Sequence, residues 1–359
     1  MDDESEALRR VVREFAGDAF SSAALRDAIA AGTYPAPAWV TLSASLGLTA
    51  IGIPEACGGA GYSFRELGVV LEELGAAVAP VPYLPTVVAA AAVLACAAEP
   101  DRGELLAEIA SGATVAVPIL TANLHAEPHG AGWVVNGTAT QVAAAPAAGL
   151  FVAAARTGAG RALLAVRTPA AGLTVRPLTS LDGTRPAGAV EFAGVPAQLL
   201  ATGPDAWPAL RLACDTHLAA LACEQVGGAA RCLDLTVAYA KTREQFGVPI
   251  GSFQAIKHRC ADLVVELEAA RSVAYHARDR VAAAFDGDTD GVHADVAAAA
   301  AWCADAYVRA AQEAIQLHGG IGFTWEHDAH LHLRRARADQ LLYGTPRDHR
   351  RELATAMGW

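Results

Sequence analysis

The sequence predicts an α+β chain in three successive parts: a helical domain, an antiparallel β domain and a helical bundle. Residues 1–113 carry mostly helical periodicity, residues 114–205 carry short apolar or β-branched runs between Gly, Pro and Asn, and residues 206–359 return to long helical patterns. The apolar residues change from a helical period of 3.6 residues to short strand-like runs and back. These two changes mark the two domain boundaries. We therefore expect three domains with these limits.

The N-terminal part predicts helices around one glycine-rich loop. Residues 35–52 predict a helix that stops at a glycine, and the loop I-P-E-A-C-G-G-A-G-Y-S follows at residues 53–63. Residues 64–77 predict a further helix, and we expect its carboxylates to lie on the solvent side. These carboxylates are Glu66, Glu72 and Glu73.

The middle part predicts an antiparallel sheet. Six short runs of apolar or β-branched residues are separated by turn-forming residues, which is the pattern of consecutive strands. The runs are Val115–Leu120, Gly132–Val135, Gly149–Ala155, Ala162–Val166, Leu173–Pro177 and Ala189–Phe192.

Composition excludes several classes of protein. Of the 359 residues, 53% are hydrophobic, which allows a large core and argues against disorder. A formal net charge of −11 argues against a nucleic-acid partner, which needs a basic face. The charged N-terminus lacks the apolar segment of a signal peptide, and the apolar runs are too short for a confident membrane span. Seven scattered cysteines without a C-x-x-C pair predict reduced thiols in the cytoplasm and no shared metal site.

Two segments predict a site for a dinucleotide. Residues 239–247, Y-A-K-T-R-E-Q-F-G, place Arg243 and Phe246 at the end of a long predicted helix, and residues 317–322, L-H-G-G-I-G, form a glycine-rich turn after another helix. The planar fork of an arginine pairs with pyrophosphate. Glycines let a backbone approach a phosphate or an adenosine closely. The sequence holds no G-x-S-x-G nucleophile turn and no Walker loop.

Five segments in order, spread over nearly the whole chain, resemble motifs of the acyl-CoA dehydrogenases. They are Ile51–Gly61, Leu181–Arg185 (L-D-G-T-R), Arg243–Gly247, Phe253–Arg259 and Gln316–Phe323. The resemblance implies the family's architecture: an N-terminal helical domain, a middle β domain and a C-terminal four-helix bundle. It also implies FAD as cofactor and an acyl-CoA as substrate.

The resemblance assigns a set of residues to FAD. In the family, the matching arginine and phenylalanine contact the pyrophosphate and adenine side, and the glycine-rich turn reaches the FAD of a neighbouring subunit, which implies a dimer or tetramer. Two simpler interpretations stay open: the arginine as a cation that stabilises a helix C-terminus, and the glycines as a helix cap. The residues assigned in this way are Arg243, Phe246, Gln254, Gln316, Gly319, Gly320 and Gly322.

The catalytic base departs from the family pattern. The family's reaction removes a proton next to the thioester, and many members take the base from a Tyr-Glu-Gly-Thr segment. Here Tyr343 occupies the place of that glutamate, and a tyrosine with an ordinary pKa of about 10 is a poor base at neutral pH. A minority of members carry the base on the first long helix of the bundle, where His217 and, seven residues later, Glu224 share a face. Either is a candidate base, and either could instead be a structural group, Glu224 as the buried partner of an arginine.

The segments of the β domain that contact the flavin ring in the family also differ from the family pattern. The family's Thr-Glu-x-x-x-Gly-Ser-Asp segment corresponds to residues 118–130, where Thr121 alone is kept as part of it. The family's Trp-Ile-Thr-Asn segment is replaced by Q-V-A-A at residues 141–144. The sequence thus keeps the adenosine and pyrophosphate half of a flavin site and loses much of the ring half.

The combined expectation is an acyl-CoA dehydrogenase subunit that catalyses FAD-dependent α,β-dehydrogenation of a sterol- or fatty-acid-derived acyl-CoA. With much of its flavin-ring site lost, the chain resembles a subunit of actinobacterial α2β2 members. In these, one subunit type lacks the base and shares FAD with its partner. Two alternatives stay open: a redox-inactive scaffold subunit with the same fold, and a homo-oligomeric enzyme that uses Glu224 as base.

Overall fold

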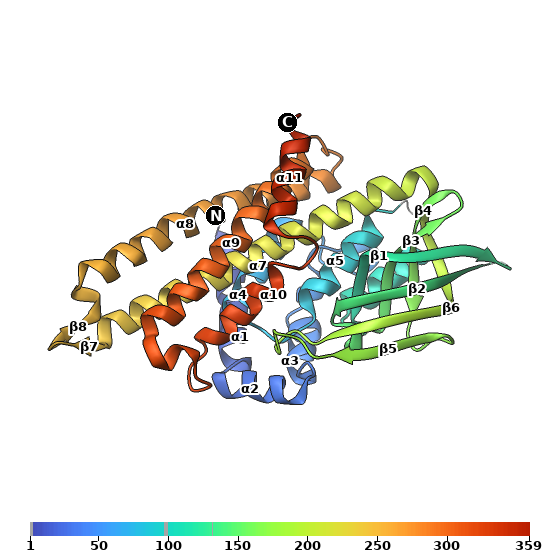
Figure 1. Cartoon of the computed structure of the whole chain (residues 1–359). Helices are drawn as coiled ribbons and strands as arrows, with labels where there is room; N and C mark the ends of the chain where they lie inside the picture. Colours follow the sequence, from blue (N-terminus) through green and yellow to red (C-terminus); the bar gives the residue numbers. More distant parts are fainter. Residues whose placement is uncertain (1–2, 97–99, 131) are drawn as a thin grey trace.

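The computed structural model describes the whole chain except residues 1–2, 97–99 and 131, and of residues 100 and 101 it describes only the backbone. Figure 1 shows a β domain at one end and three long helices that run side by side away from it. Two of the N-terminal helices, α4 (Phe64–Ala76) and α5 (Tyr83–Leu94), pack against these long helices. The order helical domain, β domain, helical bundle confirms the predicted fold class.

Six α-helices form within the described residues of the N-terminal part. Their bounds are α1 (Asp3–Ala19), α2 (Ser22–Ala31), α3 (Ala36–Val40), α4 (Phe64–Ala76), α5 (Tyr83–Leu94) and α6 (Pro100–Ala110). A capping box starts α4, because the Ser63 side chain accepts from the first turn while Glu66 accepts from the Ser63 backbone N–H at 2.9 Å. The glycine-rich loop predicted at residues 53–63 lies between α3 and α4.

Two of the three carboxylates on α4 are buried, contrary to the prediction. Glu72 and Glu73 are 4% and 6% exposed, because α1 and α8 pack over their face of the helix. Arg9 of α1 donates to Glu72 at 2.9 Å and to Glu73 at 2.5 Å, and the Tyr275 hydroxyl donates to Glu72 at 2.7 Å. The acidic pair therefore joins α4 to two other helices through ion pairs and hydrogen bonds.

The β domain is one six-stranded sheet, most of which closes into a ring. The strand order is β2-β1-β3-β4-β6-β5, and an additional β2–β6 pairing joins five of the strands into a ring. All pairs are antiparallel except β1 and β3, which run parallel. The strands are β1 (Ala116–His129), β2 (Gly132–Ala143), β3 (Leu150–Thr157), β4 (Gly160–Arg167), β5 (Leu173–Leu178) and β6 (Ala187–Thr202).

The strand β3 explains how the sheet attaches to the helices. Its residues 150–155 are all fully buried. Leu150 and Val152 belong to the core shared with the helices, whereas Phe151 and Ala153 belong to the core inside the ring. Because successive side chains of a strand point to opposite faces, this strand is covered on both sides.

Five helices form the C-terminal part, and a short hairpin, β7 (Glu244–Gln245) and β8 (Val248–Pro249), follows the first of them. The central helix α7 is buried without interruption from residue 215 to residue 229, because α4, α5, α8, α9 and α10 surround it. The helices are α7 (Ala206–Thr242), α8 (Gln254–Phe285), α9 (Val292–His318), α10 (Ala329–Asp339) and α11 (Pro346–Ala356). No helix within the described ranges is long and apolar enough to cross a membrane.

Glycine permits the close contact between α4 and α7, which gives a test of the packing. A Cβ on Gly227 would lie 1.8 Å from the backbone oxygen of Glu72, so we expect Gly227→Ala to lower the free energy of unfolding by about 1–3 kcal/mol or more. In Gly17→Ala, the control, the added Cβ meets nothing within 4 Å, and helix propensity should raise the free energy of unfolding by about 0.5–1 kcal/mol. Urea unfolding measures both; equal effects of the two substitutions would contradict the close contact.

Candidate functional site

A cavity of about 560 Å³ lies where the β domain meets α5, α7 and the segment after α10. Four positions singled out in the sequence line it together: Thr121 on β1, Gln141 on β2, His217 on α7 and Tyr343 after α10. They are far apart along the chain, and each was selected because it corresponds to a ring contact or a base of the family. The fold thus brings positions of the family's ring-contact and base segments into one place, which we call the His217 cavity.

His217 is uncharged in this cavity. Burial, with a smaller contribution from the nearby Arg185 cation, lowers the pKa of its imidazole to about 3. Its ring lies 3.9 Å from the ring of Tyr343, centroid to centroid. Neither ring nitrogen has a hydrogen-bond partner among the described residues. A neutral imidazole with so low a pKa is a weak proton acceptor, although it keeps one donor and one acceptor for a ligand.

Tyr343, which takes the place of the family's glutamate in the sequence, reaches across the cavity. Its backbone has φ of 62°, the left-handed region that a bulky residue rarely adopts. Its hydroxyl donates to the Pro118 carbonyl oxygen of β1 at 3.3 Å, so the side chain reaches from the bundle to the sheet. Burial raises the pKa of the phenol, which disfavours the phenolate. This residue is therefore a structural contact across the cavity and a poor base.

Glu224 lies behind the cavity in a buried group of charges. Arg185 and Arg335 both donate to its Oε1, and its side chain is 6% exposed. This geometry favours the interpretation of Glu224 as the partner of an arginine over that of a free base. Glu224 lines only a small void of about 10 Å³ next to both arginines.

The same buried group includes two further carboxylates, and we call the five side chains the charge cluster. Arg335 donates to Asp182 and, at 2.6 Å, to the Thr184 hydroxyl, while Arg185 donates to Asp339. Three carboxyl groups therefore face two guanidinium groups. The members of the charge cluster are Asp182, Arg185, Glu224, Arg335 and Asp339.

The charge cluster has one more carboxyl group than guanidinium groups, and this excess favours keeping one carboxyl group protonated. Burial raises the pKa of Asp339 to about 7, although Arg185 opposes the shift, and its Oδ2 has no partner among the described residues. Burial alone would also raise the pKa of Asp182, but Arg335 and Arg185 hold it below its usual value. With Asp339 protonated, the charges of the cluster balance.

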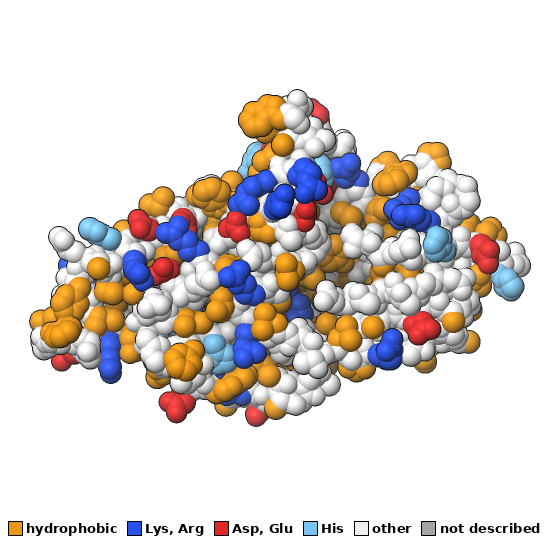
Figure 2. Space-filling model, in the orientation of Figure 1, with side chains coloured by type: hydrophobic (Ala, Val, Ile, Leu, Met, Phe, Trp, Pro, Cys, Tyr) orange, Lys and Arg blue, Asp and Glu red, His pale blue; other side chains and the backbone are white. Residues whose placement is uncertain are grey.

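The residues assigned to the cofactor gather at the opposite end of α7. Arg243 is the residue directly after α7, and Phe246, at the turn of the β7–β8 hairpin, is 94% exposed. Gln254 begins α8, and Gln316 lies in the last turn of α9. Figure 2 shows hydrophobic side chains at the end of the molecule that carries this hairpin. An exposed aromatic and an exposed arginine are available to a ligand or a neighbouring subunit.

The glycine-rich turn lies at the same end of the bundle. Gly319 has φ of 65°, which favours glycine, and a Cβ at Gly319 or Gly320 would meet no other described atom within 4 Å. Below the turn, His318 stacks on Tyr239 of α7 with ring centroids 4.5 Å apart. The turn is thus anchored on its inner side and open on its outer side, which suits the approach of a phosphate or an adenosine. Gly322, in contrast, packs against the backbone of Ile315.

These two regions cannot hold one FAD within a single chain. His217 lies on α7 and Arg243 directly follows it, 26 residues further on, which at about 1.5 Å per residue is roughly 39 Å, longer than an extended FAD. The hairpin end fits a pyrophosphate and an adenosine, because it offers a guanidinium fork, an aromatic and an open glycine turn. The His217 cavity does not fit a flavin ring in the family manner, because Tyr343 spans it. An FAD held by the hairpin end would therefore have its ring outside the His217 cavity of the same chain.

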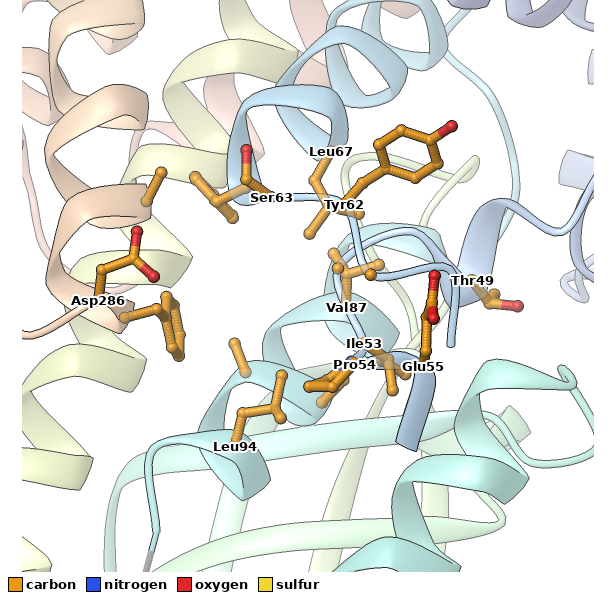
Figure 3. Close-up of a pocket in the computed structure, with 17 residues that line it drawn as sticks. Thr49, Ile53, Pro54, Glu55, Tyr62, Ser63, Leu67, Val87, Leu94 and Asp286 are labelled. Carbon is orange, nitrogen blue, oxygen red and sulfur yellow. The ribbon is translucent and has the colours of Figure 1, made fainter. Parts of the chain in front are cut away.

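A second cavity of about 560 Å³ lies between the loop before α4, α5 and the end of α8. Figure 3 shows Glu55 and Asp286 on opposite sides of it, with apolar side chains such as Ile53, Val87 and Leu94 between them. None of the site residues predicted from the sequence lines this cavity, although the I-P-E-A-C-G-G-A-G loop forms one wall.

Sequence reasoning missed the charge cluster as a unit. The L-D-G-T-R motif was identified without a role, and nothing singled out Asp339. The sequence suggested solvated or inter-subunit charges at Arg334, Arg335 and Arg337, but Arg335 is 2% exposed and belongs to the cluster. The available signal was the isolated carboxylate Glu224 in an apolar helix, which requires a buried cation somewhere in the chain.

Comparisons with known proteins find relatives over nearly the whole chain. Family models match the chain at residues 2–113, as "Acyl-CoA dehydrogenase, N-terminal domain", and at residues 215–358, as "Acyl-CoA dehydrogenase, C-terminal domain". The acyl-CoA dehydrogenase IpdE2 of Mycobacterium tuberculosis is 36% identical over 356 residues, covering 98% of this chain and 96% of the relative.

Two solved structures extend the comparison to heteromeric proteins. A variant of the Tcur3481–Tcur3483 steroid ACAD matches with a TM-score of 0.91 and 30% identity, covering 99% of this chain and 98% of the other. The ChsE4–ChsE5 complex of Mycobacterium tuberculosis matches with a TM-score of 0.90 and 28% identity, covering 100% and 98%.

The pKa of Asp339 gives a pH test of the charge cluster. Its value of about 7 in the folded chain lies above the unfolded value of about 3.9, so its stabilising contribution is complete below about pH 4 and is lost as the pH rises through 7. We expect Asp339→Asn to remove this dependence: relative to wild type, its free energy of unfolding should increase with pH between 5 and 7, by up to about 1.4 kcal/mol per pH unit.

Urea unfolding at a series of pH values measures this difference. Asp305→Asn, which alters the exposed ion pair with Arg350, is the control and should change stability by at most about 1 kcal/mol. A difference between Asp339→Asn and wild type that stays constant with pH would contradict the charge imbalance.

Proposed function

The chain belongs to the acyl-CoA dehydrogenase family of oxidoreductases, and on that premise we propose that it is one subunit of a heteromeric acyl-CoA dehydrogenase that binds the FAD of its partner subunit. In this proposal the hairpin end holds the pyrophosphate and adenosine, and the partner supplies the ring site and the base. The observation that carries the proposal is the distance of roughly 39 Å along α7 between the half of the site that keeps the family's motif residues and the altered half.

The contacts at the hairpin end support a role in cofactor binding. Arg243 can pair with the pyrophosphate through two parallel hydrogen bonds, and Phe246 offers a flat apolar surface to the adenine. The open side of the turn at Gly319 and Gly320 allows backbone N–H groups to approach the cofactor. FAD supplies the hydride acceptor of the reaction; the residues of this chain bind and orient it.

The candidate bases of this chain support a partner that removes the proton. Glu224 is engaged by two arginines, the imidazole of His217 has a pKa of about 3, and the phenol of Tyr343 has a raised pKa. A general base works best when its pKa lies near the working pH and it reaches the substrate carbon. A partner chain with an intact carboxylate would meet both requirements.

The substrate we propose is a sterol- or fatty-acid-derived acyl-CoA, acted on in the cytoplasm by an α2β2 assembly. Support comes from the 30% identity to a protein described as a steroid ACAD and from the heteromeric composition of the two matched complexes.

A redox-inactive scaffold subunit is the second candidate function. The loss of ring contacts around Gln141 and the Tyr343 side chain across the cavity favour it, because both remove the family's flavin-ring site. In that case the hairpin end would contact a partner protein without contacting flavin.

Arg243→Ala distinguishes the two functions in the complex with the partner subunit. If this chain holds the pyrophosphate, loss of a charge-assisted pair worth about 1.5–3 kcal/mol should weaken FAD binding by about 10- to 100-fold. Fluorescence titration of the deflavinated complex with FAD measures the dissociation constant.

Arg10→Ala on the exposed side of α1 is the matched control and should leave FAD affinity unchanged. Size-exclusion chromatography checks that both variants still assemble. An unchanged FAD affinity in an assembled Arg243→Ala complex would favour the scaffold function instead.

A further inference from the structure

A third cavity, of about 350 Å³, lies between α2, α10 and the segment that joins β5 to β6, and we call it the Arg334 cavity after a side chain in its wall. Its described lining shares no residue with the His217 cavity and contains none of the residues assigned to FAD. We propose that the Arg334 cavity binds a small molecule with an apolar body and one carboxylate group. This inference goes beyond the proposed function, because it concerns another ligand and another part of the chain.

Arg334 supplies a cation that is available to a ligand. No carboxylate of the described residues forms an ion pair with it, and its Nη1 donates to the Leu181 carbonyl oxygen over a long 3.4 Å. A guanidinium carries five N–H donors in one plane, so most of them are left for another acceptor. The side chain is half-buried in the wall of the cavity, and a molecule inside can therefore reach it.

Trp325 holds this guanidinium in position. The guanidinium of Arg334 lies over the Trp325 ring, 5.3 Å from its centroid, which is a favourable arrangement of a cation and an aromatic face. The segment that carries Trp325 is itself fixed to α2: Arg26 donates to the Trp325 carbonyl oxygen at 2.7 Å and pairs with Asp328 at 2.9 Å. A cation oriented before binding loses less side-chain entropy when the ligand arrives.

The charges around the cavity favour a ligand with a single negative charge. Asp182 is the one other charged side chain of the described lining, and it is 1% exposed. Its two oxygens are already occupied, because Arg335 donates to one and the Thr184 backbone N–H donates to the other at 2.9 Å. A cationic ligand therefore finds no free carboxylate here. A carboxylate, in contrast, matches the planar fork of Arg334 through two parallel hydrogen bonds.

The size and walls of the cavity suit a compact apolar body. Its volume falls within the range of about 300–1,000 Å³ typical of small-molecule sites, which are mainly apolar with a few placed polar groups. Leu178 and Leu181 are 39% and 53% exposed, so a ligand that covers them removes apolar surface from water. Prolines restrict the backbone of the wall. The apolar lining consists mainly of Ile29, Pro146, Pro177, Leu178, Leu181, Pro186 and Leu331.

Two probes that differ in charge and not in shape test the proposal. Cyclohexanecarboxylate carries the negative charge at pH 7, whereas cyclohexanecarboxamide keeps the ring and a planar head group without it. Ligand-observed NMR titration of the full-length chain, in the assembly in which it purifies, gives both dissociation constants. We expect the carboxylate to bind about fivefold more tightly, the effect of one charge-assisted pair at a half-buried site. Added salt should reduce this preference, because it screens the pair.

Variants assign the preference to Arg334. Arg334→Gln should abolish the preference for the carboxylate, because the cation is gone while hydrogen-bond donors remain. Ser180→Asp places a negative charge in the wall of the cavity and should weaken binding of the carboxylate but not of the amide. Arg337→Gln is the matched control on the same helix: this arginine donates to Gln340 at 2.9 Å and lies outside the lining, so the preference should be unchanged.

Three results would overturn the proposal: neither probe binds the wild-type chain, both probes bind it equally, or the preference survives in Arg334→Gln. If Arg334→Gln does not fold, the wild-type comparison and Ser180→Asp decide the question. FAD affinity of the same samples is recorded in parallel, so that a failure of the cavity proposal is not confused with a failure of the flavin proposal.

Discussion

The charge cluster at the centre of the molecule joins all three parts of the chain. Asp182 and Arg185 come from the segment after β5, Glu224 from α7, and Arg335 and Asp339 from α10. Arg335 also donates to the backbone oxygen of Ala79, just after α4 of the N-terminal part. Buried ion pairs are costly to dehydrate and contribute more to a specific arrangement than to net stability. Here that arrangement fixes the sheet against α7 and α10.

The ion pairs of the charge cluster also determine which side chains are available to act in catalysis. A carboxylate that accepts hydrogen bonds from two guanidinium groups is poorly placed to remove a proton, so the geometry favours a structural role for Glu224. The adjacent cavity is left with His217 and Tyr343, both in their uncharged forms. At the other end of the same helix, Arg243 stays exposed and free to meet a ligand from outside. The helix α7 thus separates a structural centre from the proposed binding surface.

Periodicity was sufficient to predict the three-part fold, and ordered motifs were sufficient to predict the family. The covering of a helix face by distant segments was not predictable: Glu72 and Glu73 on α4 look solvated until α1 and α8 pack over them. Strand direction was equally unpredictable. The sequence predicted an antiparallel sheet, because local patterns do not reveal that β1 and β3 run parallel. Both errors arise from contacts between segments far apart in sequence.

The candidate site was predictable residue by residue but not as an arrangement. Thr121, Gln141, His217 and Tyr343 were singled out separately, and only the structure shows that they line one cavity. The charge cluster was not predictable, because its balance depends on burial and on five side chains from separate segments. The assignments of Arg243 and the glycine-rich turn to FAD remain predictions.

The central claim is that this chain binds part of a flavin whose ring lies in another subunit, and flavin stoichiometry tests it most directly. Native mass spectrometry would count FAD in the chain expressed alone and in its complex with a co-expressed partner subunit. The account predicts no FAD on the isolated chain and half as many FAD molecules as subunits in the complex. A stoichiometric FAD on the isolated chain, reduced when an acyl-CoA is added, would contradict it.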